Sequence, residues 1–209
     1  MTHNRLDINN SNIMVCGIGT KGMEYPAKKN REFLKEYSVW LSLLYRCTKD
    51  YWSNKPTYTG TTCSENFKSY TFFYEWCNKQ VGFRGVDEQG RSWCLDKDIL
   101  IKGNKHYSED TCCFVPQRIN MLFTKRGSSR GEYPVGVTWR KSNNKFVANC
   151  NNGSGKYVHL GCFQTQREAF LAYKTFKEKL IKQTAEEYKE QIDPRAYTAL
   201  INYKVDAND

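Results

Sequence analysis

The sequence predicts an α+β fold in which a helix-rich first half precedes a three-stranded antiparallel sheet packed on a long helix. Aromatic and aliphatic residues recur every three or four positions between residues 31 and 77, which is the spacing of one helix face. Three runs between residues 135 and 163 alternate apolar and polar residues, as half-buried strands do. A long amphipathic stretch, residues 166 to 191, follows them and supplies a helix to cover the sheet.

The first half begins with an irregular arm, rich in Gly and Asn, that is predicted to end near Pro26. A helix is predicted over residues 31 to 47, because its apolar residues fall on one face. Residues 49 to 64 are predicted to form a polar loop. Ser64 is a suitable N-cap for a second helix, which carries an aromatic stripe as far as Cys77. Such a stripe is more typical of a core than of a base-stacking surface.

The middle of the chain is predicted to bend at Gly82, Gly85 and Gly90 and then to form a short strand over residues 92 to 96. A loop at Gly103-Asn104 leads to residues 109 to 123, which we expect to be at least partly helical and broken near Pro116. The basic, Gly- and Ser-containing run at 125–132 is the best candidate linker. The predicted division is therefore a first domain at 1–124 and a second at 133–209.

The second domain is predicted to start with strands over residues 135–140, 145–151 and 157–163, joined by turns that contain Asn, Gly and Ser. The long helix over 166–191 follows. Asp193-Pro194 then supplies an N-cap and a first-turn proline for a last short helix that ends near Tyr203.

The composition favours a polyanionic partner. The 209 residues include 32 Lys and Arg against 22 Asp and Glu, a formal net charge of +10. No stretch is apolar enough to cross a membrane, and no secretory signal follows the first charges, so we expect a cytoplasmic protein. The nine cysteines contain no CxxC pair and are odd in number, which disfavours both zinc sites and disulfides; we interpret them as small core residues.

One segment carries residues suited to phosphodiester chemistry. Leu95-Asp96-Lys97-Asp98, Gly103-Asn104, the run from Tyr107 to Phe114, and Asn120 together resemble the HNH, or ββα-metal, nuclease motif. Tyr37-Ser38-Val39-Trp40 and Arg46-Cys47 extend this likeness to phage proteins of the HNH homing-endonuclease type. It spans residues 14 to 125.

The HNH resemblance implies that Asp96 and Asn120 bind a divalent cation, Mg²⁺ or Mn²⁺, with Asp98 as a further candidate ligand. Lys97 falls where the family has its catalytic His, and Thr111 falls where the family has the Asn that orients that His. Lys at its ordinary pKa is protonated near neutral pH, so Lys97 is better suited to holding a phosphate than to acting as a base. His106, Asp98 or hydroxide on the metal could then act as the base, although a loop His is more often a solvated bystander.

The second domain resembles the Apetala-two (ethylene-response-factor) DNA-binding domain. The likeness rests on residues 136–140, 145–148, His159-Leu160-Gly161-Cys162-Phe163 and an Ala-containing helix start at Glu168-Ala169. It implies a short sheet laid into the major groove of DNA, with alternate side chains facing the bases. The candidate DNA-binding residues are Thr138, Trp139, Arg140, Lys141, Lys145, Asn149, Asn151, Tyr157 and His159. An ordinary solvated sheet face is the alternative.

Taken together, these patterns predict a site-specific, metal-dependent DNA endonuclease that acts on double-stranded DNA in the cytoplasm of a phage-infected bacterium. A monomer is favoured, although the sequence does not determine the oligomeric state. One alternative is a catalytically inactive, HNH-derived DNA-binding or regulatory protein. Another is an inhibitor that binds a host protein through the aromatic-rich first half.

Overall fold

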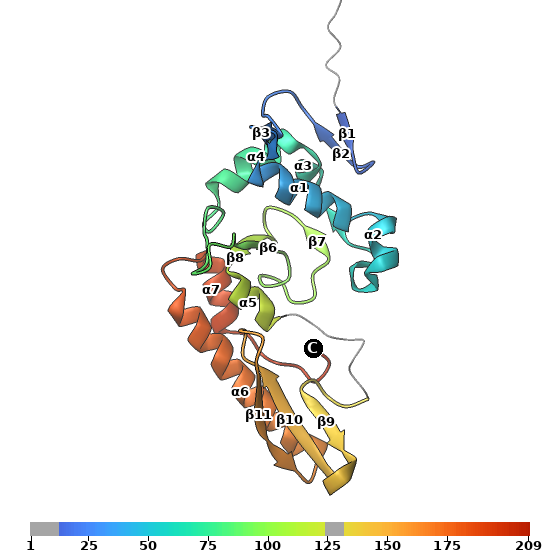
Figure 1. The fold of residues 1–209 in the computed structure, drawn as a ribbon, viewed down its shortest axis with the longest axis vertical. Coiled ribbons are helices and arrows are strands. Elements are labelled where there is room, and N and C mark those ends of the chain that lie inside the picture. Colours follow the sequence, from blue (N-terminus) through green and yellow to red (C-terminus); the bar gives the residue numbers. More distant parts are fainter. Residues whose placement is uncertain (1–12, 124–131) are drawn as a thin grey trace, which may run out of the picture.

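The computed structural model describes residues 13–123 and 132–209, and the predicted linker at 125–132 lies almost entirely outside them. The fold is α+β, as predicted: an N-terminal helical unit, a central strand–strand–helix unit, and a three-stranded sheet packed on a long helix. These parts follow one another along the longest axis of the molecule (Figure 1).

The N-terminal unit is built around the helices α1 (Lys35–Arg46) and α4 (Tyr70–Lys79). Two small hairpins precede α1: β1 (Ile13–Val15) with β2 (Gly19–Lys21), and β3 (Lys28–Lys29) with β4 (Glu32–Phe33). The helix predicted from residue 31 thus begins four residues later. Trp40, Phe67, Tyr70 and Phe73 are completely buried between the helices, so the aromatic stripe is core, as expected.

The second predicted helix is interrupted. It consists of α3 (Glu65–Lys68) and α4, and Ser69 between them is extended and accepts a hydrogen bond from Phe72 N. Ser64 accepts one from Phe67 N, which confirms it as an N-cap. The predicted loop at 49–64 is wrong in part, because Thr48 caps a short helix α2 (Lys49–Asn54), and η1 (Pro56–Tyr58) and β5 (Thr62–Cys63) follow it.

The central unit contains β6 (Cys94–Asp96), β7 (His106–Tyr107), β8 (Cys113–Val115) and α5 (Gln117–Leu122). β6 and β8 pair antiparallel, with Asp96 opposite Cys113, whereas β7 pairs with β5 of the N-terminal unit in parallel. The glycine bend wraps the buried Trp93, because a Cβ on Gly82 or Gly85 would lie within 2.6 Å of that ring. The segment at 109–123 is partly helical and broken at Pro116, as predicted, but residues 113–115 before the proline form a strand, and the helix begins only after it.

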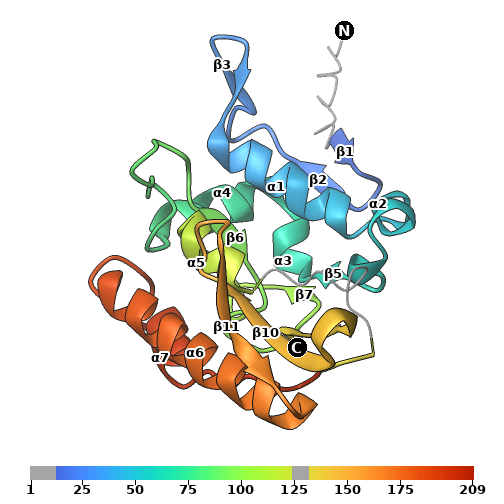
Figure 2. The same cartoon turned by 60° about the horizontal axis from the view of Figure 1, so that its bottom comes forward.

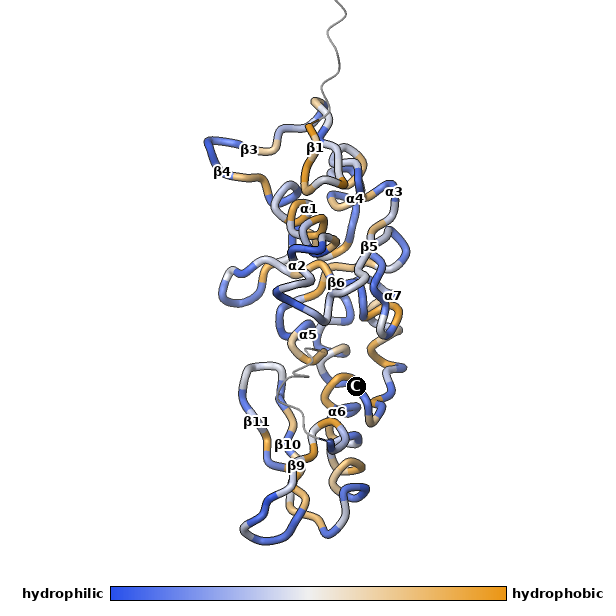
Figure 3. Tube along the Cα trace, turned by 90° about the vertical axis from the view of Figure 1, so that its right-hand side faces the viewer, coloured by the Kyte–Doolittle hydropathy of each residue, from blue (hydrophilic) through white to orange (hydrophobic). Residues whose placement is uncertain are grey.

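The C-terminal sheet has the order β11-β10-β9, and its strands are β9 (Val137–Arg140), β10 (Lys145–Asn151) and β11 (Tyr157–Phe163). The ranges of β10 and β11 match the prediction. α6 (Gln166–Glu187) covers one face (Figure 3), and Thr165 with Glu168 forms a capping box at its start. Asp193 caps α7 (Pro194–Ile201), as expected.

One hydrophobic cluster joins the central unit to the C-terminal helices. Val115 and Ile119 pack in the same cluster as Ile181 of α6 and Leu200 of α7. Polar contacts surround it: Arg118 forms an ion pair with Glu187, and Arg195 donates to the carbonyl of Cys112 at 3.4 Å. Figure 2 shows α6 and α7 side by side next to α5. The end of the chain therefore returns to the strand–strand–helix unit that precedes the sheet.

Candidate functional site

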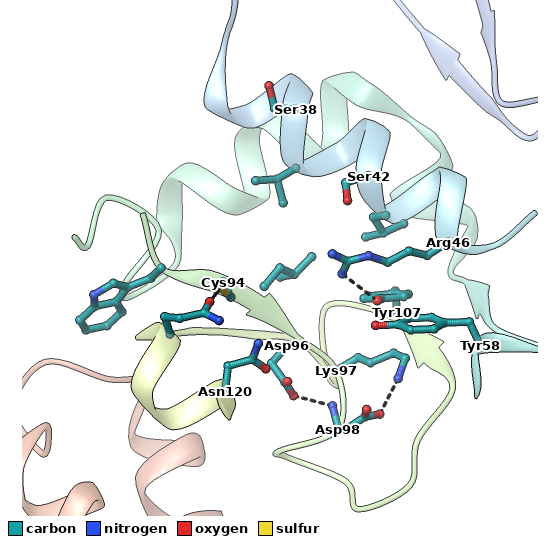
Figure 4. A pocket seen from close by; sticks show the side chains of 15 residues that line it. Ser38, Ser42, Arg46, Tyr58, Cys94, Asp96, Lys97, Asp98, Tyr107 and Asn120 are labelled. Atoms are coloured by element: carbon teal, nitrogen blue, oxygen red, sulfur yellow. Dashed lines mark hydrogen bonds and ion pairs between the residues drawn. The ribbon is translucent and has the colours of Figure 1, made fainter. Parts of the chain in front are cut away.

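A pocket of about 430 Å³ lies between the N-terminal helical unit and the central unit. Its lining comes from α1 on one side and from β6, the turn after β6, and α5 on the other, with Tyr58 and Tyr107 at one end (Figure 4). Asp96, Lys97, Asp98 and Asn120 all line it. The structure thus brings together the residues that the HNH resemblance predicts as metal ligands.

Asp96 is the last residue of β6, and its carboxylate is fixed by the turn that follows. Its Oδ1 accepts hydrogen bonds from Asp98 N at 2.7 Å and Ile99 N at 2.8 Å. Figure 4 shows this carboxylate next to the amide of Asn120 on α5. Burial raises the pKa of Asp96 above its ordinary value, and the charge of Asp98 acts in the same direction, although the two backbone bonds oppose the shift.

Lys97 and Asp98 form an ion pair beside the two candidate ligands. Lys97 Nζ lies 2.6 Å from Asp98 Oδ1 and donates to the carbonyl of Asn104 at 2.9 Å. The ammonium is also 5.6 Å from the ring centres of both Tyr58 and Tyr107, and Lys97 is 8 % exposed. These contacts hold the loop between β6 and β7 to the rest of the pocket, and they pair the carboxylate of Asp98 with the ammonium of Lys97.

His106 and Thr111 lie outside the lining of the pocket. His106 Nδ1 is 2.8 Å from Thr62 Oγ1, across the parallel pair β5–β7. Thr111 is buried and donates to the carbonyl of His106 at 2.7 Å while accepting from Ser108 N. Asn104 donates to the same carbonyl at 2.6 Å. Thr111 therefore fixes the backbone at His106, and neither residue is brought to Asp96.

The opposite wall contains residues to which the sequence assigned no role. Ser38, Ser42 and Arg46 recur at every fourth position of α1, so they share one face, and all three line the pocket. Arg46 points into the pocket across from Asp96 and Asn120, and it donates to the hydroxyl of Tyr107 at 3.2 Å (Figure 4). The signal was a polar stripe, spaced i, i+4 and i+8, beside the apolar face of the predicted helix.

The donor set fits a hard divalent cation with few protein ligands. One carboxylate and one amide supply oxygen ligands, which Mg²⁺ binds while it retains several waters. No cluster of three or more His, Cys, Asp or Glu side chains able to hold a metal exists within residues 13–123 and 132–209. A zinc-type site with nitrogen and sulfur ligands is thus not formed by that part of the chain.

The predicted DNA-reading residues share one face of the C-terminal sheet, with the exceptions of Trp139 and Lys141. The register aligns Arg140 with Lys145, Asn149 with His159, and Asn151 with Tyr157 across neighbouring strands. Thr138, Arg140, Tyr157 and His159 are exposed. Trp139 is on the other face, where its ring is 4.7 Å from that of Phe146, so it packs in the sheet. Lys141 lies in the short η3 turn (Lys141–Asn143) that follows β9, and it is exposed there.

Hydrogen bonds already engage three of these polar side chains. His159 Nδ1 is 3.2 Å from Asn149 Oδ1, which links the two strands on the outer face. Asn151 Oδ1 accepts from Gly153 N at 2.8 Å and thereby shapes the turn between β10 and β11. The hydrophilic turn between β9 and β10 is at the far end of the sheet (Figure 3). Arg140 and Lys145 are next to that turn.

Across the described residues, no helix is both long and apolar enough to span a membrane. A comparison with protein-family models, a search of curated proteins and a search of solved structures each find no match. The resemblances to HNH nucleases and to Apetala-two domains thus rest on the residues of this chain and on their arrangement.

Proposed function

We propose that the chain is a site-specific, metal-dependent DNA endonuclease of the HNH class. The observation that carries the proposal is the pocket in which Asp96, at the end of a strand, meets Asn120, on the helix after the partner strand. The ββα-metal resemblance predicts this arrangement: two antiparallel strands followed by a helix, with one oxygen ligand at the end of β6 and another on α5. The C-terminal sheet would select the DNA sequence.

The reaction would be hydrolysis of a phosphodiester. Water adds to the phosphorus, the bond to the 3′ oxygen breaks, and one proton of the water ends on that oxygen. A bound cation would neutralise charge on the phosphate and the departing oxygen. In the chain itself, Asp96 and Asn120 would hold that cation, while the Lys97–Asp98 pair keeps the turn after β6 in place.

Supercoiled plasmid incubated with the purified protein and Mg²⁺ or Mn²⁺ tests the proposal. We expect nicking or linearisation, and a loss of at least about a hundredfold in rate for Asp96→Ala and for Asn120→Ala. Asp110→Ala is the matched control, because Asp110 is an exposed carboxylate that does not line the pocket. No nicking by the wild type, or nicking that Asp96→Ala leaves unchanged, contradicts the nuclease proposal.

One observation favours a second function, a DNA-binding protein without catalysis. The described residues that line the pocket include no histidine, and the ammonium of Lys97 is engaged by Asp98 and a carbonyl. The described pocket lining therefore lacks the imidazole that the HNH resemblance expects as the base. Sequence-selective DNA retention without plasmid nicking in either cation would favour this second function.

A further inference from the structure

We propose that Arg46, held by Tyr107, is a phosphate-binding residue of the pocket, and that it takes a backbone phosphodiester of DNA opposite Asp96 and Asn120. The identity of the anion rests on the proposed function. That Arg46 binds an anion does not rest on the proposed function, because it follows from the position of the guanidinium group.

Arg46 carries a positive charge and has no carboxylate partner among residues 13–123 and 132–209. The ion pairs between described residues do not include it. Its hydrogen bond goes to the neutral hydroxyl of Tyr107, and the ring of Tyr58 is 6.0 Å away. A half-buried guanidinium has five N–H donors, so most of its donors remain for a ligand.

The position of the guanidinium is fixed by the fold. Arg46 is the last residue of α1, and Tyr107 is 2 % exposed and belongs to β7, which pairs with β5. Figure 4 shows the side chain extended from α1 into the pocket, above Asp96 and Lys97. Tyr107 therefore acts as a positioning residue that fixes one N–H group and directs the others into the cavity.

The pocket is divided into a donor side and an acceptor side. Arg46 and the exposed Ser42 provide N–H and O–H donors from α1, while Asp96 provides a carboxylate from β6. A phosphodiester suits both sides, because guanidinium groups bind its non-bridging oxygens, and the cation that Asp96 and Asn120 would hold would offset its remaining charge. At about 430 Å³ the cavity is within the size range of small-ligand sites, large enough for one phosphate with its sugars.

The test uses the full chain in EDTA, so that binding is measured without a cation. The probe is the DNA dinucleotide dTpdT, which contains one phosphodiester, titrated by NMR. We expect saturable binding, a loss of at least about tenfold in affinity for Arg46→Gln, and a smaller loss for Arg46→Lys. Tyr107→Phe keeps the ring and removes the hydroxyl, so we expect a loss of a few fold.

Arg91→Gln is the matched control, because Arg91 is exposed, pairs with Asp87 and does not line the pocket. The methylphosphonate analogue of the dinucleotide, which has no charge, should bind weakly and equally to wild type and Arg46→Gln. A ribodinucleotide, UpU, that binds at least as well would overturn the preference for DNA. Absent binding of dTpdT by wild type, or equal losses for Arg46→Gln and Arg91→Gln, would overturn the site.

The outcome separates this inference from the nuclease proposal. If plasmid is not nicked but Arg46→Gln binds dTpdT about tenfold more weakly, the phosphate site stands and catalysis fails. If Asp96-dependent nicking occurs while Arg46→Gln binds dTpdT as the wild type does, the nuclease stands and the phosphate site is wrong. Thermal unfolding of each variant shows whether a loss reflects unfolding, and Arg46→Lys, which keeps the charge, provides the second measurement.

Discussion

Replacing Asp96 by Asn should make the protein more stable and should remove its response to divalent cations. The variant keeps the Oδ1 acceptor, so both backbone hydrogen bonds, from Asp98 N and Ile99 N, can be retained. Only the negative charge is lost. Because burial raises the pKa of Asp96, the folded carboxyl holds its proton to higher pH than the unfolded one. Stability therefore falls as pH rises above the usual pKa of an aspartate, so removing the ionisable group should stabilise the fold at neutral pH.

The magnitude of the cation effect follows from linkage. A cation at ten times its dissociation constant stabilises the folded state by about 1.4 kcal/mol. For a chain of 209 residues, each kcal/mol corresponds to roughly 2 to 4 °C, so the midpoint of unfolding should rise by about 3 to 6 °C. The hydrophobic cluster that joins the central unit to α6 and α7 makes a single transition the reasonable expectation.

Thermal unfolding at neutral pH, in EDTA and in increasing Mn²⁺, measures both effects. Wild type should gain stability with Mn²⁺, and Asp96→Asn should be more stable than wild type in EDTA but gain little. Asp110→Asn, which alters an exposed carboxylate, should behave as the wild type does. An equal Mn²⁺ response in Asp96→Asn, or a variant less stable than wild type in EDTA, would refute the reasoning.

Four further outcomes are expected. Lys97→Met should lower the unfolding midpoint, because it removes about 1 to 3 kcal/mol of charged hydrogen bonding. If Lys97 were instead a catalytic base, the variant would lose nicking activity while its unfolding midpoint stayed unchanged. Arg140→Ala should relax sequence preference, and Lys145→Ala should weaken binding to all probes alike; equal effects on every DNA probe would oppose base readout. Burial raises the pKa of the Glu109 carboxyl, but hydrogen bonds from its own backbone, Asn66 and Ser64 outweigh burial, so the net pKa is lowered. The stabilisation by Glu109 is therefore present above pH 4.5 and is lost as pH falls. The difference in unfolding midpoint between wild type and Glu109→Gln should accordingly shrink from pH 7 to pH 3. Four residues inserted after Gly127 should leave the distance between the bound sequence and the nick unchanged, and a shift in cleavage mapping by the inserted length would contradict this.

The C-terminal sheet could be predicted almost residue by residue because its signals are local. Alternating residues and turn-forming Asn and Gly specify β10 and β11, and the capping box at Thr165 specifies the start of α6. β8 could not be recognised in the same way. All three of its residues are buried, so the run has no alternation and is compatible with a buried helix.

The predicted loop at 49–64 failed for a related reason. α2 has no buried residue, so no apolar stripe marks it, and only the cap at Thr48 indicates its start. β5 consists of two residues that form a strand because β7 lies beside them. Such pairing between distant segments depends on tertiary structure and has no counterpart in the local sequence.

The residues of the candidate site likewise differ in whether local sequence could predict them. Asp96 and Asn120 could be named from one continuous segment because strand, turn and helix follow one another within it. Arg46 precedes Asp96 by 50 residues and reaches the pocket only because α1 packs over the pocket. The periodicity of the sequence could place Arg46 on a polar helix face, but it could not show which part of the protein that face contacts.

α5 contacts both the pocket and the C-terminal part, so it connects the candidate metal site to the sheet that would bind DNA. Asn120 lines the pocket, while Arg118 of the same helix pairs with Glu187 of α6. Gly153, in the turn between β10 and β11, lies so close to α5 that a Cβ would be 3.0 Å from Leu122. The position of the sheet relative to the pocket is thus set by packing on α5, α6 and α7. A DNA sequence held on the sheet would therefore present the pocket with a phosphate at a fixed offset, whatever the length of the linking segment.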